Sequence, residues 1–301
     1  MQPELTDRQV TIHIGLPKTA TTTIQRHLFH NADYLRVLGL DYCTDLCRLG
    51  PFPKAAAHHA IARAHCIPGT IELPAESGHL IRERLASSGH YLLSSEVFSR
   101  ANARAAKAVV DAWDLPDHRR VVVVTRSELD FIRSHWMQGI KVGKQSDSLW
   151  EHYLVRYKPH RRVYSERFKG WLEAGFSLTA LRYDELQTSP DVTLTFLRSV
   201  LDLKIDRRKW KGIASANVSP THDAVARYQR LFQPVHRIIA PRVNQRWAAK
   251  WYIGAHDIFC KNPLIRHLGE CKQYRDDLAR VEEDLMTLSA IDDVTYSKST
   301  G

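Results

Sequence analysis

The chain has 301 residues, of which 44% are hydrophobic and 25% are charged; this is the composition of a globular protein and excludes the fibrous and intrinsically disordered classes. No stretch approaches the roughly 18 consecutive apolar residues of a membrane-spanning helix. The 43 Lys and Arg residues against 33 Asp and Glu give a formal net charge of +10, which favours anionic partners such as nucleotide cofactors, acidic glycans and nucleic acid.

The N-terminal residues contain acidic side chains and no apolar stretch as long as that of a secretory signal, so we expect a cytoplasmic protein. Its five cysteines lack the spacing of a zinc site or a CxxC pair, which fits reduced thiols in that compartment. No zinc-finger, RNA-recognition or helix-turn-helix signature accompanies the positive charge, and we therefore expect no nucleic-acid partner. The sequence leaves the oligomeric state open.

Short β-type runs alternate with helical patterns through the first two-thirds of the chain. Strands are expected at residues 10–14, 39–43, 90–94, 120–125 and 177–183. Apolar residues at helical spacing are found at residues 22–31, 56–65, 103–113 and 128–140. Four consecutive valines in the fourth strand are typical of a central parallel strand that is covered on both faces. This alternation predicts an α/β fold, a three-layer sandwich around a central parallel sheet.

After about residue 190 the strand pattern stops. The next stretch, SPDVTLTFLRSVL, predicts a helix with Ser189 as its N-cap and Pro190 at its first position. The sequence beyond residue 223 is mostly helical in pattern and rich in Arg, Lys and Trp. We therefore expect a single domain over residues 1–301, with an α/β core at 1–190 and a mainly helical C-terminal cap at 191–301.

The first strand leads into a loop and a helix that carry the clearest chemical signal, with the sequence IHIGLPKTATTT at residues 12–23. A helix that begins near Thr21 places backbone N–H groups and the positive end of its dipole at the carboxyl edge of the sheet, which favours an anion. The same stretch supplies a cation and hydroxyl donors, namely Lys18, Thr19, Thr21, Thr22 and Thr23. The Gly-Lys pair of the Walker A motif is missing, which argues against an ordinary ATPase. The alternative for this fragment is a threonine-rich helix start with an exposed lysine.

A second cationic position follows the strand at 120–125. Arg126 comes directly after that strand, and Ser134 lies eight residues later on the next expected helix. Ligands of open α/β sheets bind at this edge, so both side chains are candidates for a phosphate. Two anion sites on strand–helix corners of one sheet indicate a ligand with two separate anionic groups.

These residues resemble the sulfotransferases that use 3′-phosphoadenosine 5′-phosphosulfate (PAPS). The stretch PKTATTT is similar to the PKTGTT loop that binds the 5′-phosphosulfate in that family, and Arg126 with Ser134 has the spacing of its 3′-phosphate pair. The later LRYDELQTSPDVTLTFLRSVL is similar to a segment of many bacterial members. The resemblance spans residues 12–201. It implies a P-loop-like sulfotransferase fold and transfer of the sulfuryl group to a hydroxyl of a carbohydrate or glycoconjugate, with adenosine 3′,5′-bisphosphate as product.

One residue of the loop departs from the family pattern. Ala20 stands where the family usually has glycine, which is chosen where φ is positive or a backbone approaches a ligand closely. We predict that Ala20 keeps a negative φ within the cofactor-binding loop, with its methyl group turned away from the ligand.

The resemblance also assigns roles in the transfer. Lys18 is the candidate that stabilises the leaving oxygen, Thr21, Thr22 and Thr23 orient the sulfonate and the 5′-phosphate, and no metal is implied. Glu96 follows the strand at 90–94 and is the candidate general base for the acceptor hydroxyl. The alternative for Glu96 is a carboxylate in the first turn of a helix that Ser94 or Ser95 caps.

Two further groups of residues are less specific. His58 and His59 are the alternative base; with His65 and Cys66 they suggest a metal site, but no acidic third ligand stands near, which favours packing or a surface position. The basic run RRKWKG at 207–212 resembles a loop that closes on the 3′-phosphate in several sulfotransferases. Its candidates are Arg208, Lys209 and Lys211, for which the alternative is a solvated charge cluster.

Two other function classes remain open at this point. A P-loop kinase-like phosphotransferase would need ATP and Mg²⁺, and the missing Gly-Lys-Ser/Thr counts against it. A non-catalytic basic protein that binds anions or nucleic acid is supported by the net charge alone. The sequence does not identify the acceptor.

Overall fold

The computed structural model describes residues 8–49, 56–67, 69–87, 89–126, 128–141, 152, 164–201, 203–213 and 294–296. The chain divides into two compact units. The first unit contains residues 1–126, 163–215 and 284–301, and the second contains residues 127–162 and 216–283. Whether the two units form the single domain expected from the sequence stays a prediction.

The first unit is built on a six-stranded sheet with strand order β2-β3-β1-β4-β5-β6, in which every pair of neighbours is parallel. Its strands are β1 Gln9–Ile14, β2 Leu40–Asp41, β3 His90–Ser95, β4 Arg119–Thr125, β5 Ser177–Arg182 and β6 Val294–Tyr296. All five expected strands are present. The short edge strand β6 is an addition, because the sequence pattern indicated mainly helix in that part of the chain.

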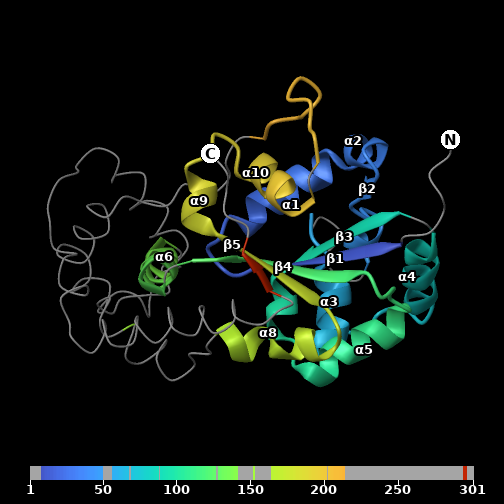
Figure 1. The fold of residues 1–301 in the computed structure, drawn as a ribbon. Helices are drawn as coiled ribbons and strands as arrows, with labels where there is room; N and C mark the ends of the chain where they lie inside the picture. The colour runs from blue at the N-terminus through green and yellow to red at the C-terminus, as the bar shows by residue number, and fades with distance from the viewer. Residues whose placement is uncertain are drawn as a thin grey trace, which may run out of the picture. The chain divides into compact units, whose positions relative to one another are not determined.

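Helices cover both faces of this sheet, as Figure 1 shows. The helices α1 Thr21–His30, α2 Ala32–Val37, α9 Tyr183–Gln187 and α10 Val192–Leu201 lie on one face. The other face carries α3 His59–Cys66, α4 Ser77–Ala86, α5 Ala103–Trp113 and α8 Tyr164–Glu173. Two short 3-10 helices, η1 Leu46–Arg48 and η2 Glu96–Arg100, connect these elements. The prediction of an α/β three-layer sandwich with a central parallel sheet is confirmed.

The valines of β4 explain why this strand lies in the centre. Val121 and Val123 pack into the hydrophobic cluster under α3, α5 and α8, whereas Val122 and Val124 pack into the cluster under α1 and α10. All four are fully buried. A strand that is apolar on successive residues therefore fills both cores at once, as a covered parallel strand must.

The register of the sheet brings several strand ends to one edge. Ile14 pairs with Ser95 of β3 and with Val123 of β4, and Thr125 pairs with Arg182 of β5. Because parallel strands end on the same side, the residues that follow β1, β3, β4 and β5 all emerge at this carboxyl edge. The candidate residues after β1, β3 and β4 are therefore neighbours in space.

The start of α10 differs from the expectation. The helix begins at Val192, and the carboxylate of Asp191 caps it by accepting hydrogen bonds from the backbone N–H groups of Thr193, at 2.9 Å, and Leu194, at 3.0 Å. Ser189, the expected cap, instead accepts a hydrogen bond from the N–H of Asp191. The Asp191 carboxylate accepts hydrogen bonds from two backbone N–H groups of the first turn, and its negative charge offsets the positive helix end. Ser189 stands two residues earlier and does not bond to these N–H groups.

The described part of the second unit is α6 Glu128–Lys141 together with His152. Within this unit the ring of His135 stacks on that of Phe131 and lies 3.2 Å from His152 between ring nitrogens. The basic C-terminal helices expected beyond residue 223 lie outside the described residues. None of the helices that the structure describes is both long enough and apolar enough to cross a membrane.

Candidate functional site

The loop between β1 and α1 packs tightly against the end of β3. Gly15 donates its N–H to the carbonyl of Ser95 at 3.2 Å. A Cβ atom at Gly15 would lie 2.3 Å from Cγ2 of Thr21 and 3.0 Å from Cγ of Glu96. Glycine is therefore required here by space, and its absence of a side chain lets α1 and η2 approach the strand end.

The threonine hydroxyls of this loop fall into two pairs. Thr19 and Thr21 are buried, and both donate to the carbonyl oxygen of Leu16, at 2.8 and 3.0 Å. Thr22 is exposed and Thr23 is half-buried, and neither hydroxyl bonds to another of the described residues. The first pair thus holds the shape of the loop, and the second pair remains open at the start of α1.

The start of α1 offers backbone donors. The first helical bond runs from the N–H of Ile24 to the carbonyl of Ala20 at 3.0 Å, so the N–H groups of Thr21, Thr22 and Thr23 have no acceptor within the helix. Among the described residues no side chain caps this helix, and no acidic residue stands in its first turn. The positive helix end is therefore uncompensated there, which suits an anion.

The prediction for Ala20 is wrong. Its φ is 57° and its ψ is 15°, in the left-handed region, and Lys18 also has a positive φ of 68°. The chain must turn from β1 into α1 while the hydroxyls of Thr19 and Thr21 both reach back to Leu16, and positive φ angles make this sharp turn. Ala20 thus keeps the conformation for which glycine is suited, at a cost of roughly 1–2 kcal/mol for a residue with a Cβ.

Arg126 lies against this loop, as expected from its place after β4. Its Nη1 donates to the carbonyl oxygen of Lys18 at 2.7 Å. Its guanidinium carbon also lies 4.7 Å from the ring centre of Tyr183, the first residue of α9. Lys18 and Arg126 therefore meet at one edge of the sheet and concentrate positive charge there.

Ser134 lies in α6, where it is buried, and α6 belongs to the second unit. Arg126 belongs to the first unit. The pairing of Arg126 with Ser134 around one phosphate therefore stays a prediction.

Glu96 is the first residue of η2, directly after β3. The hydroxyl of Ser95 caps this short helix by accepting from the N–H of Val97 at 3.1 Å, so the local alternative proposed from the sequence holds for Ser95. The carboxyl of Glu96 nevertheless lines a pocket of about 250 Å³ beside Pro17. Burial raises the pKa of Glu96, and the positive charge of Lys18 acts in the opposite direction. Glu96 is thus both the first residue of a helix that Ser95 caps and a residue that lines the pocket.

The two adjacent histidines have different surroundings. His59 lines the same pocket, with Nδ1 2.9 Å from the hydroxyl of Ser95. Burial, followed by the charge of Arg63, lowers its pKa, so the ring is neutral at pH 7. His59 is therefore within the candidate site and remains the alternative base.

His58 is fully buried and does not line the pocket. Its Nδ1 accepts from the N–H of Ser94 at 3.0 Å, its Nε2 lies 3.2 Å from the carbonyl of Cys43, and burial lowers its pKa to about 4. His65 accepts from the indole N–H of Trp113 at 3.0 Å. Both rings therefore serve the core, and within the described residues no group of three potential metal ligands is formed.

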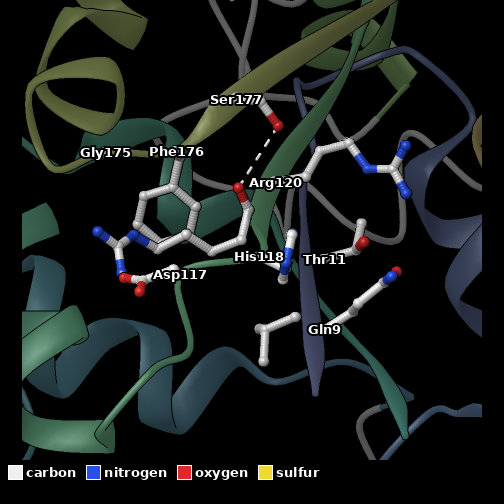
Figure 2. Close-up of a pocket in the computed structure, with 10 residues that line it drawn as sticks. Gln9, Thr11, Asp117, His118, Arg120, Gly175, Phe176 and Ser177 are labelled. Atoms are coloured by element: carbon white, nitrogen blue, oxygen red, sulfur yellow. Dashed lines mark hydrogen bonds and ion pairs between the residues drawn. The ribbon is translucent and has the colours of Figure 1, made fainter. Parts of the chain in front are cut away.

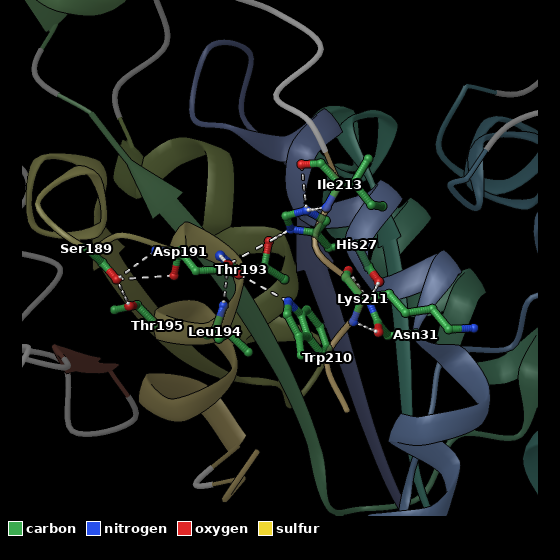
Figure 3. A network of polar contacts seen from close by, with 10 residues as sticks. All are labelled: His27, Asn31, Ser189, Asp191, Thr193, Leu194, Thr195, Trp210, Lys211 and Ile213. Atoms are coloured by element: carbon green, nitrogen blue, oxygen red, sulfur yellow. Dashed lines mark hydrogen bonds and ion pairs between the residues drawn. The ribbon is translucent and has the colours of Figure 1, made fainter. Parts of the chain in front are cut away.

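The basic run at 207–212 is fastened to α1 by its backbone, as Figure 3 shows. The side-chain amide of Asn31 accepts from the N–H of Lys211 at 2.8 Å and donates to its carbonyl at 3.1 Å. His27 Nε2 accepts from the N–H of Ile213 at 3.1 Å, and the indole of Trp210 donates to Asp191 at 3.1 Å. The side chains of Arg208, Lys209 and Lys211 are exposed, and their contact with a 3′-phosphate stays a prediction.

A second pocket, of about 460 Å³, lies at the amino ends of β1, β4 and β5 and is drawn in Figure 2. Arg120, Thr11 and Gln9 project to the same side of the strands in this view, and burial lowers the pKa of Arg120. This is the edge opposite to Lys18 and Arg126. Ligands of open parallel sheets bind at the carboxyl edge, so we place the candidate functional site there.

Three residues of the site were missed from the sequence. Tyr183 follows β5 directly, and that position was a usable signal. Arg63 stands one helical turn after His59 on α3, and this spacing was also visible. Arg100 ends η2, and nothing in its sequence neighbourhood indicates that it lines the pocket.

No protein-family model and no curated protein matches this sequence. Among solved structures, a sulfotransferase from Alicyclobacillus acidocaldarius is similar over 81% of this chain and 99% of its own, with 15% sequence identity and a TM-score of 0.42. A likeness at this identity and TM-score does not establish a function for this chain.

Proposed function

We propose that this protein is a sulfotransferase that moves the sulfuryl group of PAPS to an acceptor hydroxyl. The observation that carries the proposal is the meeting of the Lys18 loop with Arg126, whose guanidinium donates to the carbonyl of Lys18 at 2.7 Å, together with Glu96, whose carboxyl is under the influence of the Lys18 charge. A nucleotide with phosphate groups at both ends needs two cationic positions at one sheet edge. A base that faces an acceptor pocket completes the requirements for transfer.

The residues present fit the anionic groups of PAPS. The uncapped start of α1 offers backbone N–H groups, and the open hydroxyls of Thr22 and Thr23 lie on the same first turn. We assign these groups and Lys18 to the 5′-phosphosulfate, and Arg126 to the 3′-phosphate. When bound, PAPS supplies an activated sulfuryl group and a phosphate leaving group.

Lys18 and the α1 terminus act by electrostatics. With PAPS bound, the ammonium group would neutralise the negative charge that develops on the leaving oxygen, and the fixed N–H dipoles of the helix start would hold the sulfonate oxygens. Arg126 holds the loop that carries Lys18, because its guanidinium binds the backbone of that residue. Loss of the Arg126 side chain would therefore remove the cation assigned to the 3′-phosphate and would also release the loop that carries Lys18.

Glu96 is proposed as the general base that takes the proton of the acceptor hydroxyl. Burial raises the pKa of Glu96 toward neutral pH. A carboxylate with a higher pKa accepts a proton more readily, provided that it is still ionised at the working pH. We expect Glu96→Gln to bind adenosine 3′,5′-bisphosphate as the wild type does and to transfer slower by about 10²–10⁴-fold. Full turnover in this variant would move the base to His59, which shares the pocket.

The carbohydrate or glycoconjugate acceptor is the part of the proposal that rests on resemblance to bacterial sulfotransferases. The pocket beside Glu96 supports it by its size, about 250 Å³, and by a mixed lining in which hydrogen-bonding residues such as His59 and Ser99 stand among apolar ones. These groups suit hydroxyl-rich ligands through hydrogen bonds.

A thermal-denaturation comparison of ligands tests the proposal. Adenosine 3′,5′-bisphosphate at about 100 times its Kd is expected to stabilise the wild type by about 2.7 kcal/mol. Lys18→Ala and Arg126→Ala should lose this stabilisation, whereas Lys169→Ala, which removes an exposed charge on α8, should keep it. Stabilisation by ATP with Mg²⁺ alone would favour a kinase-like enzyme. Salt-sensitive binding without a preference for the bisphosphate would favour a non-catalytic anion-binding protein.

A further inference from the structure

The pocket next to Glu96 carries more positive than negative charge. Three segments form it: the loop at Pro17, helix α3 with His59 and Arg63, and η2 with Glu96 and Arg100. Glu96 is the single acidic side chain among the described residues that line it, and the two arginines stand on two different elements. Their charges therefore surround one cavity from separate directions.

The charge of Arg63 acts inside the cavity. It contributes to the lowered pKa of His59, and that ring is itself a wall of the pocket. Glu96 is also under the influence of Lys18, so three cations and one carboxylate share this small region. His59 is neutral at pH 7 and therefore adds nothing to the net charge of the pocket.

We infer that the acceptor carries an anionic group, a carboxylate or a sulfate ester, which Arg63 and Arg100 bind while its hydroxyl faces Glu96. This inference rests on the proposed function, because it takes the pocket to be the acceptor site. A guanidinium group binds carboxylate or sulfate oxygens through paired hydrogen bonds, which an ammonium group does not provide. A neutral sugar gains only ordinary hydrogen bonds from these guanidinium groups, whereas an anionic group also gains charge pairing, which makes the bonds stronger.

The size of the pocket limits how much of the acceptor it holds. Pockets for drug-sized ligands measure roughly 300–1,000 Å³. A pocket of about 250 Å³ lies below this range and accommodates one charged ring of a longer acceptor. The anionic group and the reacting hydroxyl therefore belong to the same or to adjacent units of the acceptor.

Matched glycosides test the inference without any transfer reaction. The probes are p-nitrophenyl β-D-glucuronide and p-nitrophenyl β-D-glucoside, with the galacturonide and galactoside as a second pair. Each pair differs by one carboxylate. Isothermal titration of the wild-type protein is expected to show that the acidic member binds at least about tenfold more tightly, since one hydrogen-bonded charge contact is worth about that factor.

Charge-neutral variants assign the preference to the two arginines. Arg63→Gln and Arg100→Gln should each reduce the preference by about tenfold or abolish it, and Arg63→Lys should keep part of it. Arg198→Gln, an exposed position of α10 on the other face of the sheet, removes the same charge and should leave the preference unchanged. Thermal unfolding of each variant checks that it is folded.

Three results would overturn the inference: equal or tighter binding of the neutral glycosides, an unchanged preference in both glutamine variants, or no binding of either acidic glycoside at about 10 mM, which detects even millimolar affinity. Titration with adenosine 3′,5′-bisphosphate separates this failure from that of the proposed function. A protein that binds the bisphosphate but shows no preference among the glycosides refutes the anionic acceptor alone.

Discussion

At Ala20, a residue with a Cβ occupies a left-handed backbone conformation. Relief of the steric clash by Ala20→Gly is worth roughly 1–2 kcal/mol, and the added freedom of the unfolded chain takes back roughly 0.5–1 kcal/mol. We therefore expect Ala20→Gly to stabilise the protein by about 0.5–1 kcal/mol in urea unfolding. Ala108→Gly, at an exposed position within α5, is the control and should destabilise by about 1 kcal/mol. Equal destabilisation by both changes would contradict the strain at Ala20.

Glu96 makes the stability depend on pH in a direction that its raised pKa determines. The folded state holds the carboxyl proton more tightly than the unfolded state, so ionisation of Glu96 costs stability as the pH rises through the folded pKa. Glu96→Gln removes this cost. The variant should gain stability relative to the wild type as the pH rises above the usual range of a glutamate, and the gain should level off once Glu96 is ionised in both states.

Urea unfolding at a series of pH values measures this difference. Glu72→Gln, at an exposed position, is the control for the loss of one negative charge. A gain that shrinks as the pH rises would mean that the pKa of Glu96 is lowered, and Glu96 would then be a poorer candidate for the base.

At the level of elements, the site depends on the close approach of the β1–α1 loop, α1 and η2 around Gly15. Gly15→Ala places a methyl group within 2.3 Å of Thr21 and should cost about 1–3 kcal/mol, as overpacking does. We also expect weaker stabilisation by adenosine 3′,5′-bisphosphate, because the start of α1 must shift. Gly78→Ala in α4 meets no atom nearer than 3.9 Å and should stabilise by about 0.5–1 kcal/mol. If Gly15→Ala were as stable as the wild type, α1 and η2 would be able to move apart without an energetic cost, which would contradict the tight packing around Gly15.

The fastening of the basic run to α1 is the second arrangement of elements that can be tested. Asn31→Ala removes both hydrogen bonds to the backbone of Lys211 and one to the carbonyl of His27, and should cost about 1–3 kcal/mol. The released run at 207–212 should then be cut faster by trypsin, which cleaves after Arg and Lys. His30→Ala, at the exposed preceding position, is the control. An unchanged cleavage rate in Asn31→Ala would mean that other contacts hold this run.

Across the whole molecule, the sequence predicted what local patterns encode. The strands are short apolar runs, and α5 at Ala103–Trp113 has the predicted bounds because its apolar residues keep helical spacing between a capping Asn102 and the end of the helix. The positions of Lys18 and Arg126 followed from the rule that parallel strands end at one edge. These features depend on a few consecutive residues and on topology.

What the sequence did not predict depends on contacts between distant segments. The positive φ of Ala20 occurs in a turn in which Thr19 and Thr21 both donate to the carbonyl of Leu16, and composition alone does not reveal these bonds. The pocket lining joins Pro17, α3 and η2, and its basic character became visible only once these elements were folded together. Strand β6 is three residues long, too short for a periodicity to be recognised.

Two arginines mark the two edges of the sheet: Arg120 lies near the start of β4, and Arg126 directly follows the end of this strand. Arg120 and Arg126 are six residues apart along an extended strand, which places their backbones about 20 Å from each other. Arg126 contacts the Lys18 loop, whereas the side chain of Arg120 makes no hydrogen bond or ion pair within the described residues, and its charge helps to lower the pKa of His90 to about 4. A half-buried cation without a hydrogen-bonded partner is unfavourable for stability.

We therefore expect Arg120→Met to stabilise the protein by up to about 1 kcal/mol, since the side chain is partly solvated and its cost is correspondingly small. The variant should keep the full stabilisation by adenosine 3′,5′-bisphosphate, because that ligand is assigned to the carboxyl edge. Arg126→Ala should lose it, although both changes remove one positive charge and the two positions are only six residues apart. If Arg120→Met also lost the nucleotide response, binding would follow the overall charge of +10 or involve the amino edge, and the assignment of the nucleotide to the Lys18 and Arg126 edge would be wrong.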